Sequence, residues 1–414
     1  MRKKNSLKNM IGSVLSNVLT IIVGVIAQAV FLKNLGTEFL GLNGLFTNII
    51  SMLAIVELGI GNAIIYNLYK PLANNNIEAI KSLMAFYKKS YRIIASLVSI
   101  IGIAIIPFLS YFVETVEVSV NINLIYLLFL IEVVCSYLLS YKRSILFADQ
   151  KNYIINYIHI GYTIVLNILQ ILILIITKNY YLYLIIKIIM RILENIIITL
   201  YVNKKYDYLK DDDCAKLNND TEKDIFKKVK ALFFHKVGTF IINGTDNLII
   251  SKMISLAVVG LYSNYYMIIN AVQTVFKQII QATTASVGNL LITEDKNKCF
   301  DIFKKIRFLN FWVACFSSIS VLIVMDSFII IWLGKEYILP EIVLFALVFN
   351  LYQKLMRNVY MSFKEAAGIF HEDRFIPIIE AILNIFFSIV LCRIIGLAGV
   401  FLGTIISGLC LWCY

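Results

Sequence analysis

The sequence predicts an all-α integral membrane protein with about 12 membrane-spanning helices. The first observation is composition: 60% of the 414 residues are hydrophobic and only 15% are charged, against about 25% charged residues in a soluble domain. The second is a mean hydropathy of +0.81. The third is that the apolar residues fall into blocks of about 20, the number a helix needs to cross a hydrocarbon core about 30 Å thick. Together these observations exclude a water-soluble globule.

Each predicted span is a predominantly apolar block bounded by charged or polar residues. The first block follows four basic residues, but it is too long for a signal peptide, so we expect it to be retained as a span. The last block, of about 19 residues, barely crosses the membrane. In order, the spans cover residues 11–32, 41–66, 93–112, 122–141, 153–176 and 180–202, and then 233–254, 258–282, 308–333, 342–361, 377–394 and 396–414.

Basic residues collect in alternate connections between these spans. Lysine and arginine number 38 and aspartate and glutamate 26, which gives a net charge of +12. One side of the membrane receives most of the basic residues, and the other holds little beyond Lys33, Lys178, Lys252, Lys335 and Arg393. Because cytoplasmic connections carry the excess of basic residues, we predict a multi-pass protein of the cell membrane with a cytoplasmic N-terminus. Its expected surface partners are anionic lipids, and no nucleic-acid-binding motif is present.

An internal repeat predicts two lobes. GLNGLFTNII from Gly41 aligns with GLYSNYYMII from Gly260 at an offset of 219 residues, and FYKKSYR from Phe86 then lies opposite IFKKIR from Ile302. Six spans separate equivalent helices, and an even number preserves direction, so the repeats are parallel. We predict six-helix lobes at residues 1–202 and 233–414, a cytoplasmic linker at 203–232 and a central cavity. The alternative is a chance match between apolar helices.

Ionisable residues within the spans are the candidate site residues, because a charge at hydrocarbon depth costs a few kcal/mol unless it faces a cavity or a partner. Lys187 and Arg191 are four residues apart and share a helix face, where they repel unless an anion lies between them. Arg191 is also three residues from Glu194, so an internal salt bridge is equally consistent with the sequence. Lys187 can alternatively extend its side chain to the membrane surface. Glu132 lies in the fourth span.

The repeat offset suggests a second set of candidates. It places Lys277 and Glu57 at similar depths in the membrane, in opposite lobes. The two residues either pair and gate the cavity, or do not meet because Lys277 lies at the inner interface. The same offset maps Asp246 onto Ala27, whose neighbour Gln28 is the nearest polar side chain in the first lobe. His235 and Lys236 begin the seventh span from the cytoplasm, where they meet an incoming anion or lipid headgroups.

The sequence shows no catalytic apparatus. No phosphate-cradling glycine loop or nucleophile elbow is present, and the outer connections are too short for a catalytic loop. Cys410 and Cys413 have CxxC spacing, but no second pair or nearby histidine completes a metal site. We therefore predict a protein that is not an enzyme and needs no cofactor or metal.

Four stretches resemble the Wzx-type polysaccharide repeat-unit flippases of the multidrug/oligosaccharidyl-lipid/polysaccharide exporter superfamily. They are NLGTEFLGLNGLFTNIISMLAIVELGIGNAIIYNLYKPLA from Asn34, TDNLIIS from Thr245, VGLYSNY from Val259, and MRNVYMSFKEAAGIFHEDRFIPIIEAILNIFFSIVLCRIIGLAGVFLGTIIS from Met356. The resemblance implies a MATE-like fold. It also implies export, by alternating access, of an undecaprenyl-diphosphate-linked oligosaccharide for capsule or O-antigen synthesis.

On this resemblance, the cations at Arg191, Lys187 and Lys277, with His235 and Lys236, are the candidates for binding the diphosphate. The acids Glu57, Asp246 and Glu194 are the candidates for gating or for coupling to H⁺ or Na⁺. Family members commonly continue beyond the GTIIS motif, so the resemblance implies either a relative with a shorter second lobe or an incomplete chain. A cation-coupled multidrug antiporter of the same superfamily is the main alternative, and an integral-membrane polysaccharide polymerase or glycosyltransferase is a more distant one.

Overall fold

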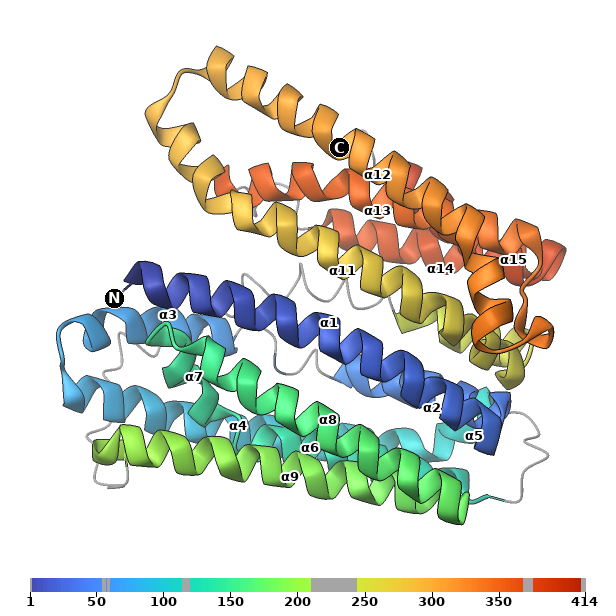
Figure 1. The fold of residues 1–414 in the computed structure, drawn as a ribbon, viewed down its shortest axis with the longest axis horizontal. Helices are drawn as coiled ribbons and strands as arrows, with labels where there is room; N and C mark the ends of the chain where they lie inside the picture. Colours follow the sequence, from blue (N-terminus) through green and yellow to red (C-terminus); the bar gives the residue numbers. More distant parts are fainter. Residues whose placement is uncertain are drawn as a thin grey trace. The chain divides into compact units, whose positions relative to one another are not determined.

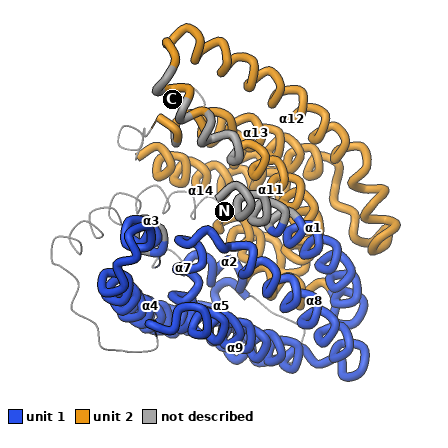
Figure 2. The backbone as a smooth tube through the Cα atoms, turned by 60° about the vertical axis from the view of Figure 1, so that its left-hand side comes forward, with its two compact units in different colours: residues 1–36, 46–236 blue, residues 37–45, 237–414 orange. Residues whose placement is uncertain are grey.

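A computed structural model describes residues 2–53, 57, 60–113, 120–209, 244–367 and 375–410. Within these ranges the regular secondary structure is helical, without strands. The chain forms two compact units, shown in different colours in Figure 2. Unit 1 comprises residues 1–36 and 46–236, and unit 2 comprises residues 37–45 and 237–414. The boundary therefore falls inside one helix, α2 (Thr37–Leu53).

Unit 1 is a bundle of long helices with three short ones. The long helices α4, α6, α8 and α9 run lengthwise beside one another, and α1 packs on α8 (Figure 1). The helices of unit 1 are α1 (Arg2–Leu35), α3 (Ile60–Ala73), α4 (Ile77–Ile105), α5 (Leu109–Phe112), α6 (Ile122–Leu138), α7 (Tyr141–Ala148), α8 (Asn152–Thr177) and α9 (Tyr180–Lys205).

A tight turn and an aromatic contact align α1, α8 and α9. Lys178 adopts a left-handed conformation with φ 50° and ends α8. The Asn179 side chain then accepts hydrogen bonds from the first backbone N–H groups of α9. Phe31 of α1 packs edge-on against Tyr180 and Tyr183 at the start of α9. These contacts fix the register of α9, which carries the principal charged residues of unit 1.

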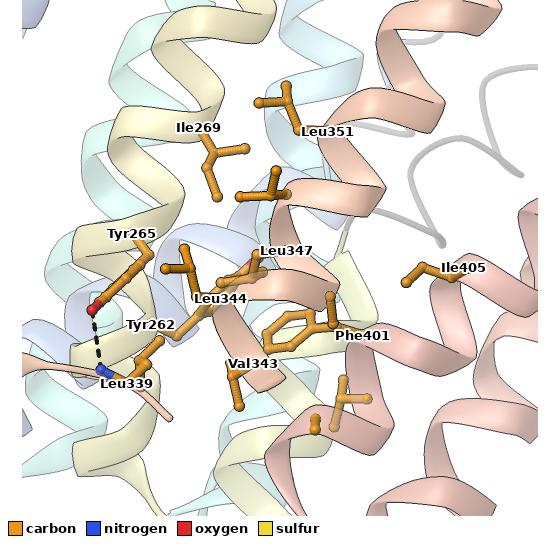
Figure 3. Packing of buried hydrophobic residues seen from close by; sticks show 14 of the residues in the cluster. Tyr262, Tyr265, Ile269, Leu339, Val343, Leu344, Leu347, Leu351, Phe401 and Ile405 are labelled. Carbon is orange, nitrogen blue, oxygen red and sulfur yellow. Dashed lines mark hydrogen bonds between the residues drawn. The ribbon is translucent and has the colours of Figure 1, made fainter. Parts of the chain in front are cut away.

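Unit 2 contains five numbered helices and a helical segment at residues 244–253. The central helix α13 packs against α11, α12 and α15. Figure 3 shows the core between them, where the Tyr265 hydroxyl accepts a hydrogen bond of 3.0 Å from the backbone N–H of Leu339. The numbered helices are α11 (Leu256–Thr293), α12 (Lys296–Trp332), α13 (Glu341–Ala367), α14 (Ile376–Ile395) and α15 (Leu397–Cys410).

Small and polar residues hold α14 and α15 together. A Cβ added at Gly403 would lie 2.4 Å from the backbone nitrogen of Ser388, so the two backbones are in direct contact. Beside this contact, Asn384 donates a 2.8 Å hydrogen bond to the Thr404 hydroxyl, and the Ser388 hydroxyl donates to the Val400 carbonyl. Close approach of small residues with hydrogen bonds between helices is typical of membrane-embedded helix pairs.

Where the structure describes them, the predicted spans correspond to helices, with two differences; residues 233–243 and 411–414 of the predicted spans lie outside the described ranges. The predicted span 41–66 consists of two helices, because α2 ends at Leu53 and α3 begins at Ile60. The residues after the fourth predicted span form a separate helix, α7, bent by 48° from α6. Within the described residues, five helices are long and apolar enough to cross a membrane, or six if α6 and α7 form one span. The chain is therefore a multi-pass helical membrane protein.

Candidate functional site

A network of ion pairs joins α6, α7, α8 and α9 inside unit 1. Arg191 of α9 lies at its centre and contacts two carboxylates. Its Nε is 3.0 Å from Oε1 of Glu132 on α6, and its Nη1 is 2.6 Å from Oε2 of Glu194. The Tyr162 ring lies 4.8 Å from the guanidinium carbon. Arg191 therefore forms the internal salt bridge that the sequence left as one of two alternatives.

Glu194 is the most enclosed member of the network, with a side chain that is 0% exposed. Besides Arg191, it contacts Arg143 of α7 at 3.1 Å and the Nδ1 of His159 on α8 at 2.9 Å. Arg143 also donates a 2.8 Å hydrogen bond to the side-chain oxygen of Asn195. A buried carboxylate needs such a set of donors to offset its lost hydration. Glu194 thus binds α7, α8 and α9 to one another.

Lys187 has the weakest attachment of the cations in this network. Its Nζ lies 3.7 Å from Oε2 of Glu132, which is beyond hydrogen-bond distance, and its side chain is 29% exposed. The ring of Phe129 lies 5.2 Å from the ammonium. Since an ammonium has three donors, Lys187 retains hydrogen-bonding capacity that the described residues do not use.

The network has more positive than negative groups. It contains three permanent cations, Arg143, Lys187 and Arg191, against the two carboxylates of Glu132 and Glu194, an excess of one positive charge with His159 neutral. The surplus is associated with Lys187, because Arg143 and Arg191 each contact a carboxylate within 3.1 Å.

The periodicity of α9 explains how these groups meet. Lys187, Arg191 and Glu194 are spaced by four and three residues and so lie on one face of the helix. That face packs against α6 and α8. Glu132, Arg143 and His159 complete the network. The sequence identifies Glu132 as an acid within a span but assigns it no partner, and it does not select Arg143 or His159. The pairing of these residues with α9 depends on helix packing.

Glu57 lies in a separate polar cluster of unit 1, between α2 and α3. It accepts a short hydrogen bond from the Tyr91 hydroxyl, which in turn accepts a 3.0 Å hydrogen bond from Tyr87. A Cβ added at Gly61 would lie 2.9 Å from the Tyr87 hydroxyl, so this glycine lets α3 approach the tyrosines closely. Tyr137 packs against the Tyr91 ring. Glu57 is therefore held by tyrosines of α4, whereas its suggested partner Lys277 belongs to unit 2.

Two acids of unit 2 have basic neighbours on α13. Glu380 of α14 receives both guanidinium nitrogens of Arg357, at 2.5 and 2.9 Å. Asp246, in the helical segment 244–253, interacts electrostatically with Lys354. Its buried Oδ1 accepts no hydrogen bond from the described residues. Asp246 thus differs from Glu380, whose carboxylate is paired through both oxygens.

The remaining predicted residues are not part of either cluster. Lys277 lies on α11 and is exposed. His235, Lys236 and Cys413 lie outside the described residues, as does most of the predicted linker 203–232. In the part of the chain that the structure describes, no group of three or more His, Cys, Asp and Glu residues is placed to hold a metal ion.

The fold is that of the MATE transporters of the MOP superfamily. An inward-facing multidrug resistance MATE family transporter matches with a TM-score of 0.73 at 13% identity, covering 95% of this chain and 92% of that chain. A Vibrio cholerae MATE transporter, VcmN, matches with a TM-score of 0.67 at 13% identity, covering 100% of this chain and 96% of that one. The lipid II flippase MurJ, in an inward closed conformation, matches with a TM-score of 0.64 at 15% identity, covering 97% and 85%.

The chain belongs to the polysaccharide biosynthesis protein family, whose sequence profile matches residues 6–284. This match confirms the resemblance that the motifs from Asn34 and Thr245 indicated. No curated protein matches the chain significantly by sequence. The three matched structures that share this fold are two MATE transporters and a lipid II flippase.

Proposed function

We propose that the protein moves a polyprenyl-diphosphate-linked oligosaccharide from the cytoplasmic to the outer leaflet by alternating access. The family match to polysaccharide biosynthesis and the fold shared with a lipid II flippase support this proposal. The observation that carries it is Lys187, an ammonium within a membrane-spanning unit. It lies next to a network with surplus positive charge, and the described residues place their nearest carboxylate oxygen 3.7 Å from it, beyond hydrogen-bond distance.

The chemistry of the cargo fits this arrangement. The sugar and diphosphate are too polar to cross hydrocarbon, whereas the polyprenyl tail can stay in the lipid during transfer. A fixed cation replaces part of the water that the diphosphate loses, and charge-assisted hydrogen bonds to phosphate are about twice as strong as neutral ones. Lys187 contacts the diphosphate in this proposal. Arg191 is a positioning residue, because its donors already serve Glu132 and Glu194.

The wider arrangement is part of the same proposal. Lobes at residues 1–202 and 233–414 enclose a cavity, the N-terminus is cytoplasmic in the cell membrane, and basic connections bind anionic lipids at the inner face. The cargo serves capsule or O-antigen synthesis. Lys277, His235 and Lys236 assist in attracting the anion. Glu57 and Asp246 couple transport to H⁺ or Na⁺. Glu194 stabilises the cluster of cations through its contacts with Arg143, His159 and Arg191.

A cation-coupled multidrug antiporter is the second candidate. The fold shared with MATE transporters supports it, and so does the buried Asp246 oxygen without a hydrogen bond from the described residues. The two candidates need cavities of opposite charge, because an antiporter binds cationic drugs whereas the flippase binds a diphosphate.

Ligand-induced stabilisation separates these candidates. A ligand that binds only the folded protein at 100 times its Kd stabilises it by roughly 2.7 kcal/mol. We expect a polyprenyl-diphosphate-linked oligosaccharide to raise the Tm of the purified protein, and a cationic dye such as ethidium to leave it unchanged. The same polyprenol carrying no phosphate is the matched control for tail binding. A Tm raised by the dye and not by the diphosphate lipid would support the antiporter instead.

A further inference from the structure

The two copies of the internal repeat meet at a pair of glycines within unit 2. A Cβ added at Gly41 of α2 would lie 2.1 Å from the carbonyl oxygen of Leu256 on α11. A Cβ added at Gly260 of α11 would lie 2.1 Å from the carbonyl oxygen of Thr37 on α2. Thr37 and Leu256 are separated by the same 219 residues as the two glycines. The contact is therefore reciprocal, as it is across a two-fold axis.

A second pair with the same offset continues the contact along both helices. A Cβ added at Gly44 would lie 2.8 Å from Oγ of Ser263, which is 219 residues further on. The Gly44 carbonyl also accepts a 3.4 Å hydrogen bond from the side-chain amide of Asn247. One face of α2 thus lies against α11 from its first turn to Gly44, with backbone against backbone at the glycines.

This contact accounts for the division of α2 between the units. Residues 37–45 belong to unit 2, whereas the rest of the helix belongs to unit 1, where Phe46 packs edge-on against Tyr126 and Phe129. The segment 37–45 is preceded by Gly36, which has φ +87° and lies in open space. Glycine adopts this left-handed conformation, which joins α1 to the segment, without the steric penalty of a Cβ.

The location of the contact indicates its role. It involves the first turns of α2 and α11, and both helices start on the outer side if the N-terminus is cytoplasmic. A cavity that opens to the outside must separate helices at this end, while a cavity open to the cytoplasm must keep them together. Glycine-to-glycine packing suits such a contact, because it is close but has no interlocking side chains to disentangle.

We propose that the segment 37–45 and the start of α11 form the outer gate of the transport path, a glycine latch closed in this structure and opened to release the cargo. This inference rests on the proposed function and on the cytoplasmic N-terminus. The latch comprises Gly41 and Gly260 as the reciprocal contact, with Gly44, Ser263 and Asn247 beside it. It requires the contact to break once in every transport cycle.

A reversible cross-link tests the latch. Gly44→Cys and Ser263→Cys, introduced together after the native cysteines are replaced by serine, place two thiols within disulfide reach, because only side-chain ends adjoin position 44. We expect oxidation to lower the rate of lipid-linked oligosaccharide translocation in vesicles at least tenfold, and dithiothreitol to restore it. The two single variants are the controls: each should translocate at the same rate under oxidising and reducing conditions. An oxidised pair that translocates as fast as the reduced pair would contradict the latch.

A second readout of the same positions needs no cargo. Spin labels on Gly44→Cys and Ser263→Cys should show two distance populations in lipid vesicles, one in contact and one separated. A single short distance under all conditions would contradict the latch, whatever the protein transports. Conversely, two populations combined with no translocation by the wild-type protein would retain the latch and refute the proposed cargo.

Discussion

Replacing Lys187 by glutamine is expected to slow translocation of a lipid-linked oligosaccharide roughly tenfold to hundredfold without lowering the Tm. The range follows from about 1.5–3 kcal/mol for a hydrogen bond to a charged group. Stability should persist, because in the structure the ammonium has only two weak contacts among the described residues, 3.7 Å to Glu132 and 5.2 Å to the Phe129 ring. Rates in reconstituted vesicles and thermal unfolding in detergent measure the two effects separately.

Lys178→Gln is the matched control for this variant. Lys178 is exposed at the turn between α8 and α9, so the substitution removes the same charge from the same pair of helices. We expect it to translocate at the wild-type rate. A Lys187→Gln variant that is as fast as wild type, or one that is slowed no more than Lys178→Gln, would show that Lys187 does not contact the cargo.

Replacing Arg191 by alanine is expected to destabilise the protein by about 3 kcal/mol or more, the usual effect of removing one partner from a buried ion pair. Glu132 would lose its 3.0 Å contact, and Glu194 would lose its shortest one. Thermal or denaturant unfolding in detergent measures the loss. Because Glu194 keeps Arg143 and His159, unit 1 should remain folded but less stable.

A double variant shows whether Arg191 acts through its partners. Combining Arg191→Met with Glu132→Gln removes both members of one pair, and it should recover part of the stability that Arg191→Ala loses. The opposite pattern, with translocation abolished and the Tm unchanged in Arg191→Ala, would mean that the guanidinium binds the cargo directly. The two residues are therefore distinguished by their variants: Lys187→Gln should change the translocation rate and not the Tm, whereas Arg191→Ala should lower the stability.

Most of the helices could be predicted from sequence, because apolar length and flanking charge are local properties. The predicted spans 153–176 and 180–202 correspond to α8 and α9. The separation of α2 from α3 was missed, although Gly59 and Gly61 within VELGIG lower helix propensity there. The short helix α7 was missed because its sequence, YKRSILFA, is too polar to be recognised as a span.

The candidate site was predictable only in part. Intramembrane charge selected Lys187, Arg191 and Glu194 correctly as neighbours on one helix face, because their spacing is local. The contributions of Arg143 and His159 come from other helices, and hydropathy does not specify which faces of those helices meet. The repeat offset selected Gly41 and Gly260 as equivalent residues, but their contact depends on packing that no alignment of the chain with itself describes.

Translocation by the purified protein is the most direct test of the central claim. The wild-type protein is reconstituted into vesicles with a polyprenyl-diphosphate-linked oligosaccharide, and access of an external sugar-modifying probe to the oligosaccharide is followed over time. We predict that the fraction of oligosaccharide modified rises well above the half that faces outward initially, and that protein-free vesicles stay at that level. A modified fraction that remains at the level of protein-free vesicles would contradict the assignment of this chain as a flippase for lipid-linked oligosaccharides.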